Sequence, residues 1–474
     1  MSLVERMADI PAAAELGRVH LMGVGGAGMS GIARILLARG LTVSGCDAKE
    51  STVLVPLRAL GARVEIGHDA AHLRDADTVI ISSAIRPSNP ELSAARERGL
   101  RVLPRAAALA SVMAGRVGVA VAGTHGKTTT TSMLTVALHA CGRDPSYAIG
   151  GDLNEPGSNA HHGSGRFFVA EADESDRSFL LLSPYAAIIT NVEADHLDSY
   201  GRPEAIDAAF EEFIGRLDSD GVLLLGADDP GSRRLVGLAR GEGLTVRTFG
   251  QARDADVRID DLHLLGSGSS FDLVAEGRRL GRVDLQVPGA YNAVNAAGAL
   301  GLGLALGQPF GDMARGVASF AGVRRRFEFK GVSGGVRVYD DYAHHPTEVS
   351  NGALAAARGV AGNGRVIAVF QPHLYSRTQT FAEAFGAALS AADVVVVMEV
   401  YPAREDPLPG VTGALIAAAV PLPAAQVFFE PSWAAVPALV AGLARSGDVV
   451  VTIGAGDVTM IGPAVLDTLS RAAP

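Results

Sequence analysis

The sequence is poor in cysteine and has no long hydrophobic run. Cys46 and Cys141 are the only cysteines among its 474 residues, without a CxxC pair, which argues against a disulfide framework or a cysteine-rich metal site and fits a reducing compartment. The N-terminus has no apolar run followed by a cleavage site, and no uncharged stretch is long enough to span a bilayer. We therefore expect a cytoplasmic protein without membrane insertion.

Positive charge is also scarce, and lysine especially so. The formal net charge of −10 argues against nucleic acid or an anionic membrane as the main partner and favours small-molecule substrates. The only lysines are Lys49, Lys127 and Lys330, so arginine supplies the general surface charge. Lys127 lies inside a glycine-rich loop, where a compact ammonium fits and a planar guanidinium does not. We interpret it as a residue selected for chemistry.

Short apolar runs alternate with helical patterns in three stretches of the chain, which is typical of parallel sheets with crossover helices. The buried-strand runs are Val19–Met22, Thr42–Cys46 and Thr78–Ser82, then Val117–Ala122, Phe167–Ala170 and Ala187–Thr190, then Val336–Tyr339, Val366–Phe370, Val394–Met398 and Val449–Ile453. Weaker alternation over residues 252–288 predicts antiparallel strands at the edge of the second domain. The pattern predicts an α/β protein of three domains, with boundaries at 1–113, 114–321 and 322–474.

The first glycine-rich segment follows the first predicted strand and precedes a helix. It contains Gly23, Gly25, Gly26 and Gly28, and Asp47 follows at the end of the next strand. Glycines there let the backbone approach a pyrophosphate at the helix N-terminus. A nicotinamide or flavin site and a purely structural turn are both compatible with this pattern.

The second glycine-rich segment has the same strand–loop–helix context and a stronger signal. Its residues are Gly123, Thr124, His125, Gly126, Lys127, Thr128 and Thr129. Backbone amides of such a loop bind phosphate oxygens, the lysine bridges the terminal phosphates, and an adjacent hydroxyl can ligate Mg²⁺. Because Val121 occupies the place of the distant first glycine, we interpret the loop as a shortened P-loop.

Polar clusters follow two further strands of the same predicted domain. One runs from Glu171 to Asp176 and the other from Thr190 to Asp198. Any single carboxylate there is most simply part of a solvated rim, but the carboxyl edge of an α/β sheet is where nucleotides bind, and oxygen ligands suit Mg²⁺. We take Glu171 and His196 as functional residues.

Later polar residues extend the candidate site. Asn292 and Asn295 open an Ala-rich helix, as helix caps or as readers of an adenine edge. The run from Arg324 to Arg326 could reach a phosphate with a guanidinium fork, or be a solvated basic turn. Two clusters follow strands of the third domain, where ligands bind. They contain Asp341, His344 and His345, and His373, Tyr375 and Arg377.

In order along nearly the whole chain, GVGGAGMS, AGTHGKTTTTSM, EADESD, TNVEADHLDSY, DDYAHHPTE and FQPHLYSRT resemble the motifs of the Mur ligase family. The resemblance implies a Rossmann-like N-terminal domain that binds a UDP sugar, a central P-loop ATPase domain and a Rossmann-like C-terminal domain that binds an amino acid. It implies ATP-dependent ligation of L-alanine to the lactyl carboxylate of UDP-N-acetylmuramate, with Mg²⁺, in peptidoglycan precursor synthesis.

The resemblance also implies a role for each matching residue. The catalytic residues would be Lys127, His196, His344 and Arg377. ATP would be bound by residues 123–129 with Asn292, Asn295, Arg326 and Asp341, and the metal by Thr128, Glu171 and His196. The UDP sugar would be bound by Gly23, Gly25, Gly26, Gly28, Met29, Ser30, Asp47 and Ser82, and the amino acid by His345, His373, Tyr375 and Arg377.

Two residues depart from the family pattern. Cys46 stands where serine is usual, and Arg177 where glycine is usual, which affects contacts to the UDP sugar or to loops of the site rather than the chemistry. Three alternatives stay open: a related ligase that attaches a whole peptide to the same sugar acid, a nicotinamide-dependent oxidoreductase, and a nucleotide-gated binding protein. The oligomeric state is not predicted.

Overall fold

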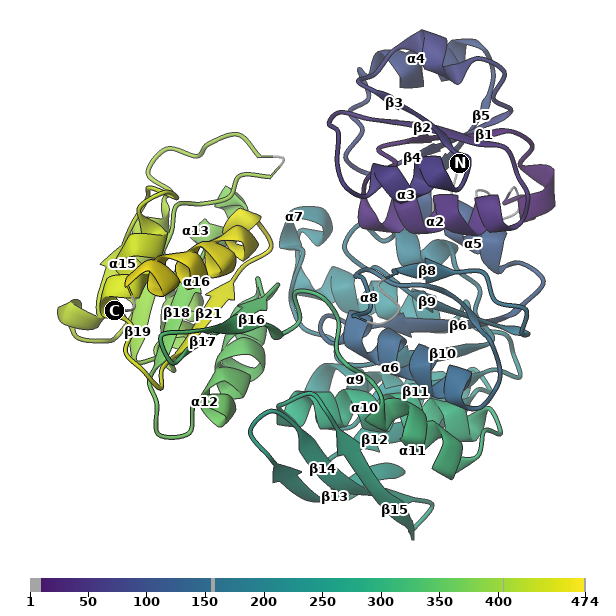
Figure 1. Ribbon diagram of the computed structural model, residues 1–474. Helices are drawn as coiled ribbons and strands as arrows, with labels where there is room; N and C mark the ends of the chain where they lie inside the picture. The colour runs from purple at the N-terminus through teal and green to yellow at the C-terminus, as the bar shows by residue number, and fades with distance from the viewer. Residues whose placement is uncertain (1–9, 155–157, 404, 473–474) are drawn as a thin grey trace. The chain divides into compact units, whose positions relative to one another are not determined.

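The computed structural model describes residues 10–154, 158–403 and 405–472. These residues form three mainly parallel sheets with helices packed against them (Figure 1). These residues fall into two compact units, one formed mainly by residues up to Asp260 and one mainly by the residues from Phe320 onward. The predicted α/β fold with three sheets is confirmed, whereas the boundaries at 113/114 and 321/322 stay predictions. In the part of the chain that is described, no helix has the length and apolarity to cross a membrane.

The N-terminal sheet has the order β3-β2-β1-β4-β5, and its strands are all parallel. The strands are β1 Val19–Met22, β2 Val43–Asp47, β3 Arg63–Ile66, β4 Thr78–Ile81 and β5 Arg101–Pro104. The helical segments are η1 Ala13–Glu15, α2 Ala27–Ala38, α3 Leu54–Ala59, η2 Ala70–Leu73, α4 Pro90–Glu97 and α5 Arg105–Met113. Separate apolar clusters line its two faces, one including α2 and α5 residues and the other α4 residues, so helices cover both.

The central sheet has the order β15-β14-β13-β12-β11-β10-β6-β9-β7-β8. Its strands are β6 Val117–Ala122, β7 Ser146–Ala148, β8 Ala160–His161, β9 Phe167–Glu171, β10 Ala186–Ile189, β11 Val222–Gly226, β12 Thr245–Gly250, β13 Val257–Leu264, β14 Ser269–Ala275 and β15 Arg278–Leu285. The helical segments are α6 Lys127–Ala140, η3 Ser178–Leu181, α7 Leu197–Tyr200, α8 Pro203–Ile214, α9 Pro230–Gly241, α10 Ala290–Ala305 and α11 Phe310–Ala318. β13, β14 and β15 lie at the edge of the sheet, as expected, joined by loops too short for a crossover.

The C-terminal sheet has the order β16-β17-β21-β18-β19-β20. Its strands are β16 Glu328–Ser333, β17 Val336–Asp341, β18 Val366–Phe370, β19 Val394–Val397, β20 Val427–Phe429 and β21 Val449–Ile453. The helical segments are η4 Glu348–Leu354, α12 Ala355–Ala361, α13 Tyr375–Leu389, α14 Gly413–Ala419, η5 Ala424–Gln426, α15 Val436–Leu443, η6 Asp457–Met460 and α16 Ile461–Ala472. Two apolar clusters again line its two faces, which explains the uninterrupted runs of valine in β19 and β21.

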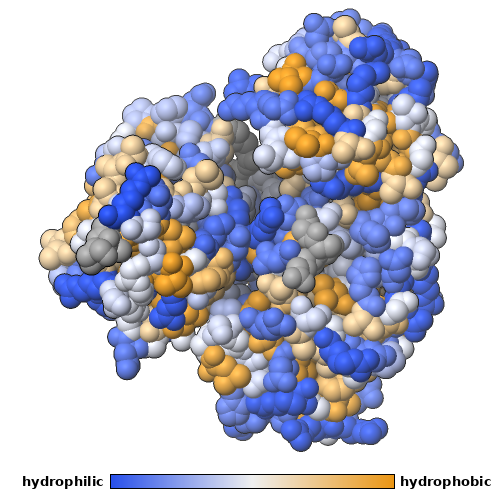
Figure 2. All heavy atoms as spheres, in the orientation of Figure 1, coloured by the Kyte–Doolittle hydropathy of each residue, from blue (hydrophilic) through white to orange (hydrophobic). Residues whose placement is uncertain are grey.

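The surface differs from these interiors in composition. Hydrophilic residues cover most of the face shown in Figure 2, and the hydrophobic residues on that face form several separate patches.

Candidate active site

The loop between β6 and α6 is folded so that only glycine fits at two of its positions. Gly123 and Gly126 have φ values of 125° and 82°, in the left-handed region. A Cβ on Gly126 would also lie 2.6 Å from Asn295 Oδ1. The loop is fastened to the end of β10, because the amides of Thr124 and His125 donate to Asn191 at 3.0 and 2.8 Å. The backbone is therefore held ready to present amides at the N-terminus of α6.

Lys127, the first residue of α6, folds back over this loop. Its ammonium donates to Gly123 O at 2.7 Å, to Thr124 O at 3.1 Å and to Glu174 Oε1 at 2.9 Å. Burial lowers the pKa of Lys127, but the nearby carboxylates of Glu174, Asp173 and Glu171 outweigh burial, so the pKa lies above its ordinary value. The lysine is therefore charged, as contact with a polyphosphate requires.

His196 joins the same group of charges. Its Nε2 lies 3.5 Å from Glu174 Oε1 and 3.6 Å from Asp195 Oδ2. Burial lowers the pKa of His196, and these carboxylates raise it more, so the imidazole holds its proton more tightly than usual. His196 has φ 52°, and this turn after β10 brings the ring toward Glu174.

The candidate metal ligands lie around this group. Glu171 is the last residue of β9, where its Oε2 accepts from Gly150 N at 2.8 Å, and the Thr128 side chain is buried in the first turn of α6. Strands β9, β6 and β10 are parallel neighbours, so their carboxyl ends share one edge of the sheet. Carboxylate oxygens and a hydroxyl beside a phosphate-binding loop are the donor types that suit Mg²⁺, so the residues fit a magnesium-bound nucleotide.

Asn292 and Asn295 do not cap a helix, contrary to one of our interpretations. Helix α10 begins at Ala290, so both asparagines lie within it, and both are buried. Asn292 Nδ2 donates to Pro288 O at 2.7 Å, while Asn295 lies against Gly126 of the phosphate loop. The structure thus brings Asn295 to the predicted nucleotide site.

The N-terminal glycine loop is tied to the end of the next strand. Gly23 has φ 79°, and Gly25 N donates to Asp47 Oδ2 at 2.9 Å. By contrast, Met29 packs in the core, and Ser30 Oγ donates to Ala27 O of its own helix. Of this predicted set, Met29 and Ser30 therefore have the surroundings of core residues. Gly26 caps the start of α2 and Gly28 packs against Arg105.

A cavity of about 250 Å³ lies at the carboxyl ends of β4 and β5. Ser82 lines it, as predicted for the UDP sugar, together with Asp176 of the predicted acidic cluster and with Ser83, Arg105 and Ser178, which the sequence reasoning missed. Arg105 is held by Asp173 at 3.0 Å, from the acidic segment next to Lys127. The sequence did contain a pattern that could have identified Arg105, because this residue begins a helix directly after a strand. The cavity thus adjoins the group around Lys127.

Arg177 follows the acidic segment in a strained conformation. Its φ of 63° is in the left-handed region, which explains why glycine would be usual there. Its guanidinium lies 5.8 Å from the centre of the Tyr200 ring and 3.8 Å from Glu212.

Asp341 ends strand β17 in the second unit, and it is buried. Its carboxylate accepts from Phe327 N at 2.8 Å and from Ala343 N at 2.7 Å. Burial raises the pKa of Asp341 to about 7, against the lowering effect of Arg326 and these amides. Arg326 lies 3.9 Å from Glu348, whereas Arg325 donates to two backbone carbonyls, which indicates a structural role for Arg325.

The predicted amino-acid-binding residues and the predicted catalytic His344 lie in three places. The rings of His344 and His373 lie 6.2 Å apart, and His373 stacks on Tyr401 at 5.8 Å. His345 instead packs against Phe381 in the interior. Tyr375 and Arg377 belong to the first turn of α13, where Arg377 is buried.

A charged lysine in a phosphate-type loop, beside carboxylates at the end of a parallel sheet, defines the class of ATP-dependent α/β enzymes. Three family models match the chain: the Mur ligase family catalytic domain at residues 18–117, the Mur ligase middle domain at 121–303, and the Mur ligase glutamate ligase domain at 325–456. The chain belongs to the Mur ligase family, whose members are ATP-dependent amide-bond ligases.

Individual relatives are similar over nearly the full length. The chain is 60% identical over 457 residues, 96% of each sequence, to the UDP-N-acetylmuramate–L-alanine ligase of Acidothermus cellulolyticus. It is 57% identical over 98% of each sequence to the ligase of the same name from Kineococcus radiotolerans. The crystal structure of UDP-N-acetylmuramate-alanine ligase MurC from Thermotoga maritima is 28% identical and covers 96% of this chain and 100% of its own, with a TM-score of 0.80.

Proposed function

We propose that this protein joins L-alanine to the lactyl carboxylate of UDP-N-acetylmuramate while ATP becomes ADP and phosphate, as a step of peptidoglycan precursor synthesis. The observation that carries the ATP chemistry is Lys127, charged and held between the loop carbonyls and Glu174. Support for the two other substrates comes from full-length relatives named for them. A cytoplasmic location belongs to the same proposal.

The first chemical step activates the carboxylate. A free carboxylate is a poor acyl donor because its leaving group would be oxide. One lactyl oxygen attacks the γ-phosphorus of ATP, ADP leaves, and an acyl phosphate forms. Lys127 and the amides of residues 123–128 offset the negative charge on the transferring oxygens. Thr128, Glu171 and His196 would hold Mg²⁺, which would add positive charge at the phosphates.

The second step forms the amide. The nitrogen of L-alanine attacks the acyl carbon, phosphate leaves, and the nitrogen gives up a proton to a base. His196 and His344 are the two candidates for that base, and His196 can act only while its nitrogen does not hold the metal. Glu174 and Asp195 raise the pKa of His196, so it is a proton acceptor of more than ordinary strength whenever it starts neutral.

The cavity at the ends of β4 and β5 is the proposed site for part of the UDP sugar. Arg105 supplies a guanidinium there, and a guanidinium pairs with phosphate oxygens in a two-point geometry. Arg105 pairs with Asp173 in the acidic segment next to Lys127, and this supports a pose in which the lactyl end of the sugar faces Lys127. His373, Tyr375 and Arg377 are the proposed contacts for L-alanine, with Arg377 matched to its carboxylate.

Phosphate release by the purified protein tests this proposal. ATP, Mg²⁺ and UDP-N-acetylmuramate are supplied with L-alanine, with the tripeptide L-alanyl-γ-D-glutamyl-meso-diaminopimelate, or with neither, and Lys127→Ala is the control. We expect release that requires L-alanine and is lost in the variant, with little turnover when the amine is omitted. Release with the tripeptide alone would replace the proposal by a peptide ligase, and rapid turnover without any amine would contradict the coupling.

A further inference from the structure

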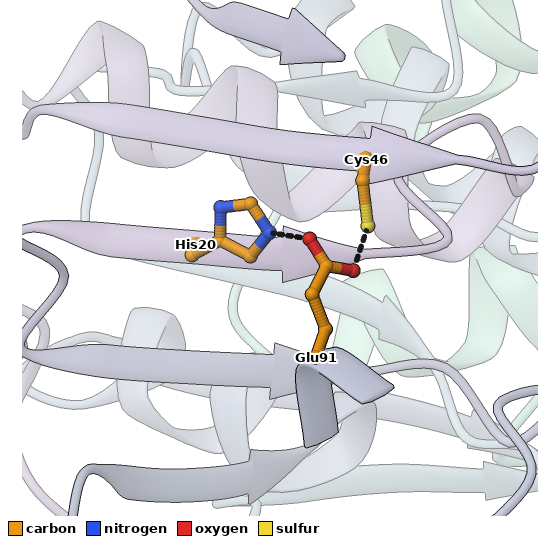
Figure 3. Close-up of side chains that lie close together, drawn as sticks. All are labelled: His20, Cys46 and Glu91. Carbon is orange, nitrogen blue, oxygen red and sulfur yellow. Dashed lines mark hydrogen bonds and ion pairs between the residues drawn. The ribbon is translucent and has the colours of Figure 1, made fainter. Parts of the chain in front are cut away.

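A second cluster of reactive side chains lies in the N-terminal sheet, apart from the residues assigned above. His20 on β1, Cys46 on β2 and Glu91 at the start of α4 are all fully buried, and Figure 3 shows the Glu91 carboxylate reaching both His20 and Cys46. His68 and His72 contact the same carboxylate from the segment after β3. One carboxylate is thus surrounded by three imidazoles and a thiol, all of which are metal-ligand types.

Three of the donor atoms form a closed triangle. Cys46 Sγ lies 2.8 Å from Glu91 Oε2, His68 Nδ1 lies 2.9 Å from the same oxygen, and Sγ lies 3.2 Å from Nδ1. If the thiol and the imidazole both donate to Oε2, no proton is left on the edge between sulfur and nitrogen. The lone pairs of Cys46 Sγ and His68 Nδ1 then face each other, and a cation bound between the two atoms would remove this repulsion.

His20 supplies a fourth donor atom. Its Nδ1 lies 2.9 Å from Ser44 Oγ, whose own proton is directed to Val19 O at 3.4 Å. In the tautomer that carries its proton on Nδ1, Nε2 presents its lone pair toward Glu91 Oε1 at 3.4 Å, which is the arrangement that metal binding requires. Among the described residues, this buried Nε2 has no hydrogen-bond partner of regular geometry, and its contact with Glu91 Oε1 is the ion pair drawn in Figure 3. An inward lone pair opposite a carboxylate oxygen is a site for a positive ion.

The spacing and the chemistry of these atoms select the ion. The donor atoms of His20, Cys46 and Glu91 all lie within 4.8 Å of one another. Tetrahedral zinc, with bonds of about 2.0 to 2.3 Å, spaces its ligand atoms about 3.5 Å apart. A set of imidazole, thiolate and carboxylate suits zinc and its close neighbours rather than Mg²⁺ or Ca²⁺. We propose that His20, Cys46, His68 and Glu91 form a binding site for Zn²⁺.

Binding exchanges a proton for the metal. Burial and the contact with Glu91 raise the pKa of Cys46, so the metal-free site holds the thiol. Zn²⁺ forms a bond to sulfur as the S–H bond breaks, and one proton leaves to solvent. His72 Nδ1, 3.0 Å from Glu91 Oε1, is the residue that orients the carboxylate from outside the ligand set.

The site is connected to the first glycine loop. Cys46 O accepts from Gly23 N at 2.8 Å and from Val24 N at 3.0 Å. A metal bond at Cys46 would therefore fix the strand end on which that loop rests, so the ion has a structural role rather than a place in the ligation reaction. The role requires cysteine, since a serine at position 46 offers no thiolate.

Cobalt is the probe, because Co²⁺ bound to a thiolate has a charge-transfer absorption band. The full-length protein is used as Cys141→Ser, which removes the other cysteine, and is treated with a chelator before titration. We expect one equivalent of Co²⁺ to produce the band and Zn²⁺ to displace it. His72→Gln should keep the band and weaken the affinity about tenfold to a hundredfold.

Cys46→Ser is the decisive variant, and it keeps a donor for Glu91, so the fold should survive. Loss of the band in this variant supports the site, and a band that persists overturns it, as does absence of the band before the change. If the variant does not fold, X-ray absorption of the zinc-loaded Cys141→Ser protein decides. One sulfur ligand at about 2.3 Å supports the site, and a shell of nitrogen and oxygen alone overturns it.

Discussion

The pairing of Lys127 with Glu174 makes a prediction about stability that is independent of catalysis. Lys127→Met removes the ammonium and keeps a similar stem, which leaves the Glu174 carboxylate, only 3% exposed, without its partner at 2.8 Å. Removing one member of a buried ion pair costs about 3 to 5 kcal/mol. His196, at 3.5 Å from the carboxylate, can take up part of the charge. We therefore expect a loss of about 3 kcal/mol.

A double variant removes the unpaired carboxylate of Glu174 as well. In Lys127→Met with Glu174→Gln no carboxylate is left unpaired, so stability should return to within about 1 kcal/mol of the parent, which is about 2 kcal/mol above the lysine variant alone. For a domain of roughly 200 residues, 3 kcal/mol corresponds to a fall in melting temperature of about 6 to 12 °C.

Circular dichroism measures this shift, and Trp433 gives an internal control. It is the single tryptophan and lies in the second unit, so its fluorescence reports the unfolding of that unit. We expect the lysine variant to lower the melting temperature seen by circular dichroism and leave the fluorescence transition in place. Equal stability of the single and double variants would refute the reasoning.

Three further results are expected. Gly126→Ala should weaken ATP binding and should destabilise the protein more than Gly142→Ala does. Both glycines have positive φ, but only Gly126 is crowded by a side chain, so Gly142→Ala should cost only the backbone strain of about 1 to 2 kcal/mol. Equal losses of stability for the two variants in calorimetry would contradict this. Arg105→Ala should raise KM for the UDP sugar about tenfold to a hundredfold and KM for ATP much less, whereas the exposed Arg96→Ala should change neither. Burial raises the pKa of Asp341 from 3.8 to about 7, so the folded protein favours the protonated carboxyl. The stability that this protonation contributes is complete below pH 3.8 and is lost as the pH rises through about 7. The melting temperature should therefore fall more between pH 5 and 8 in the parent than in Asp341→Asn, and parallel profiles of the two proteins would contradict this.

The strands that could be predicted from sequence are those buried on both faces. Val117–Ala122, Val366–Phe370 and Val449–Ile453 end where the apolar runs end, because a sheet covered by helices on both sides requires an uninterrupted run. β3 and β12 were not predicted, since their residues are largely polar and partly exposed. Such strands take their conformation from pairing with a neighbour, which is a property of the fold rather than of the segment.

The same distinction holds for the site. The phosphate loop and the clusters after strands could be found, because a motif and a strand end are both local in sequence. The pairing of Lys127 with Glu174 and the meeting of His20, Cys46 and Glu91 could not, because each joins segments dozens of residues apart. These contacts follow from the strand order, which no local pattern reports.

Transfer of oxygen from the sugar acid to phosphate tests the central claim most directly. UDP-N-acetylmuramate with both lactyl carboxylate oxygens labelled with oxygen-18 is incubated with ATP, Mg²⁺, L-alanine and the protein, and the released phosphate is examined by mass spectrometry. An acyl phosphate intermediate predicts one labelled oxygen in each phosphate released. Unlabelled phosphate would mean that water, not the carboxylate, takes the phosphoryl group, and would contradict the account.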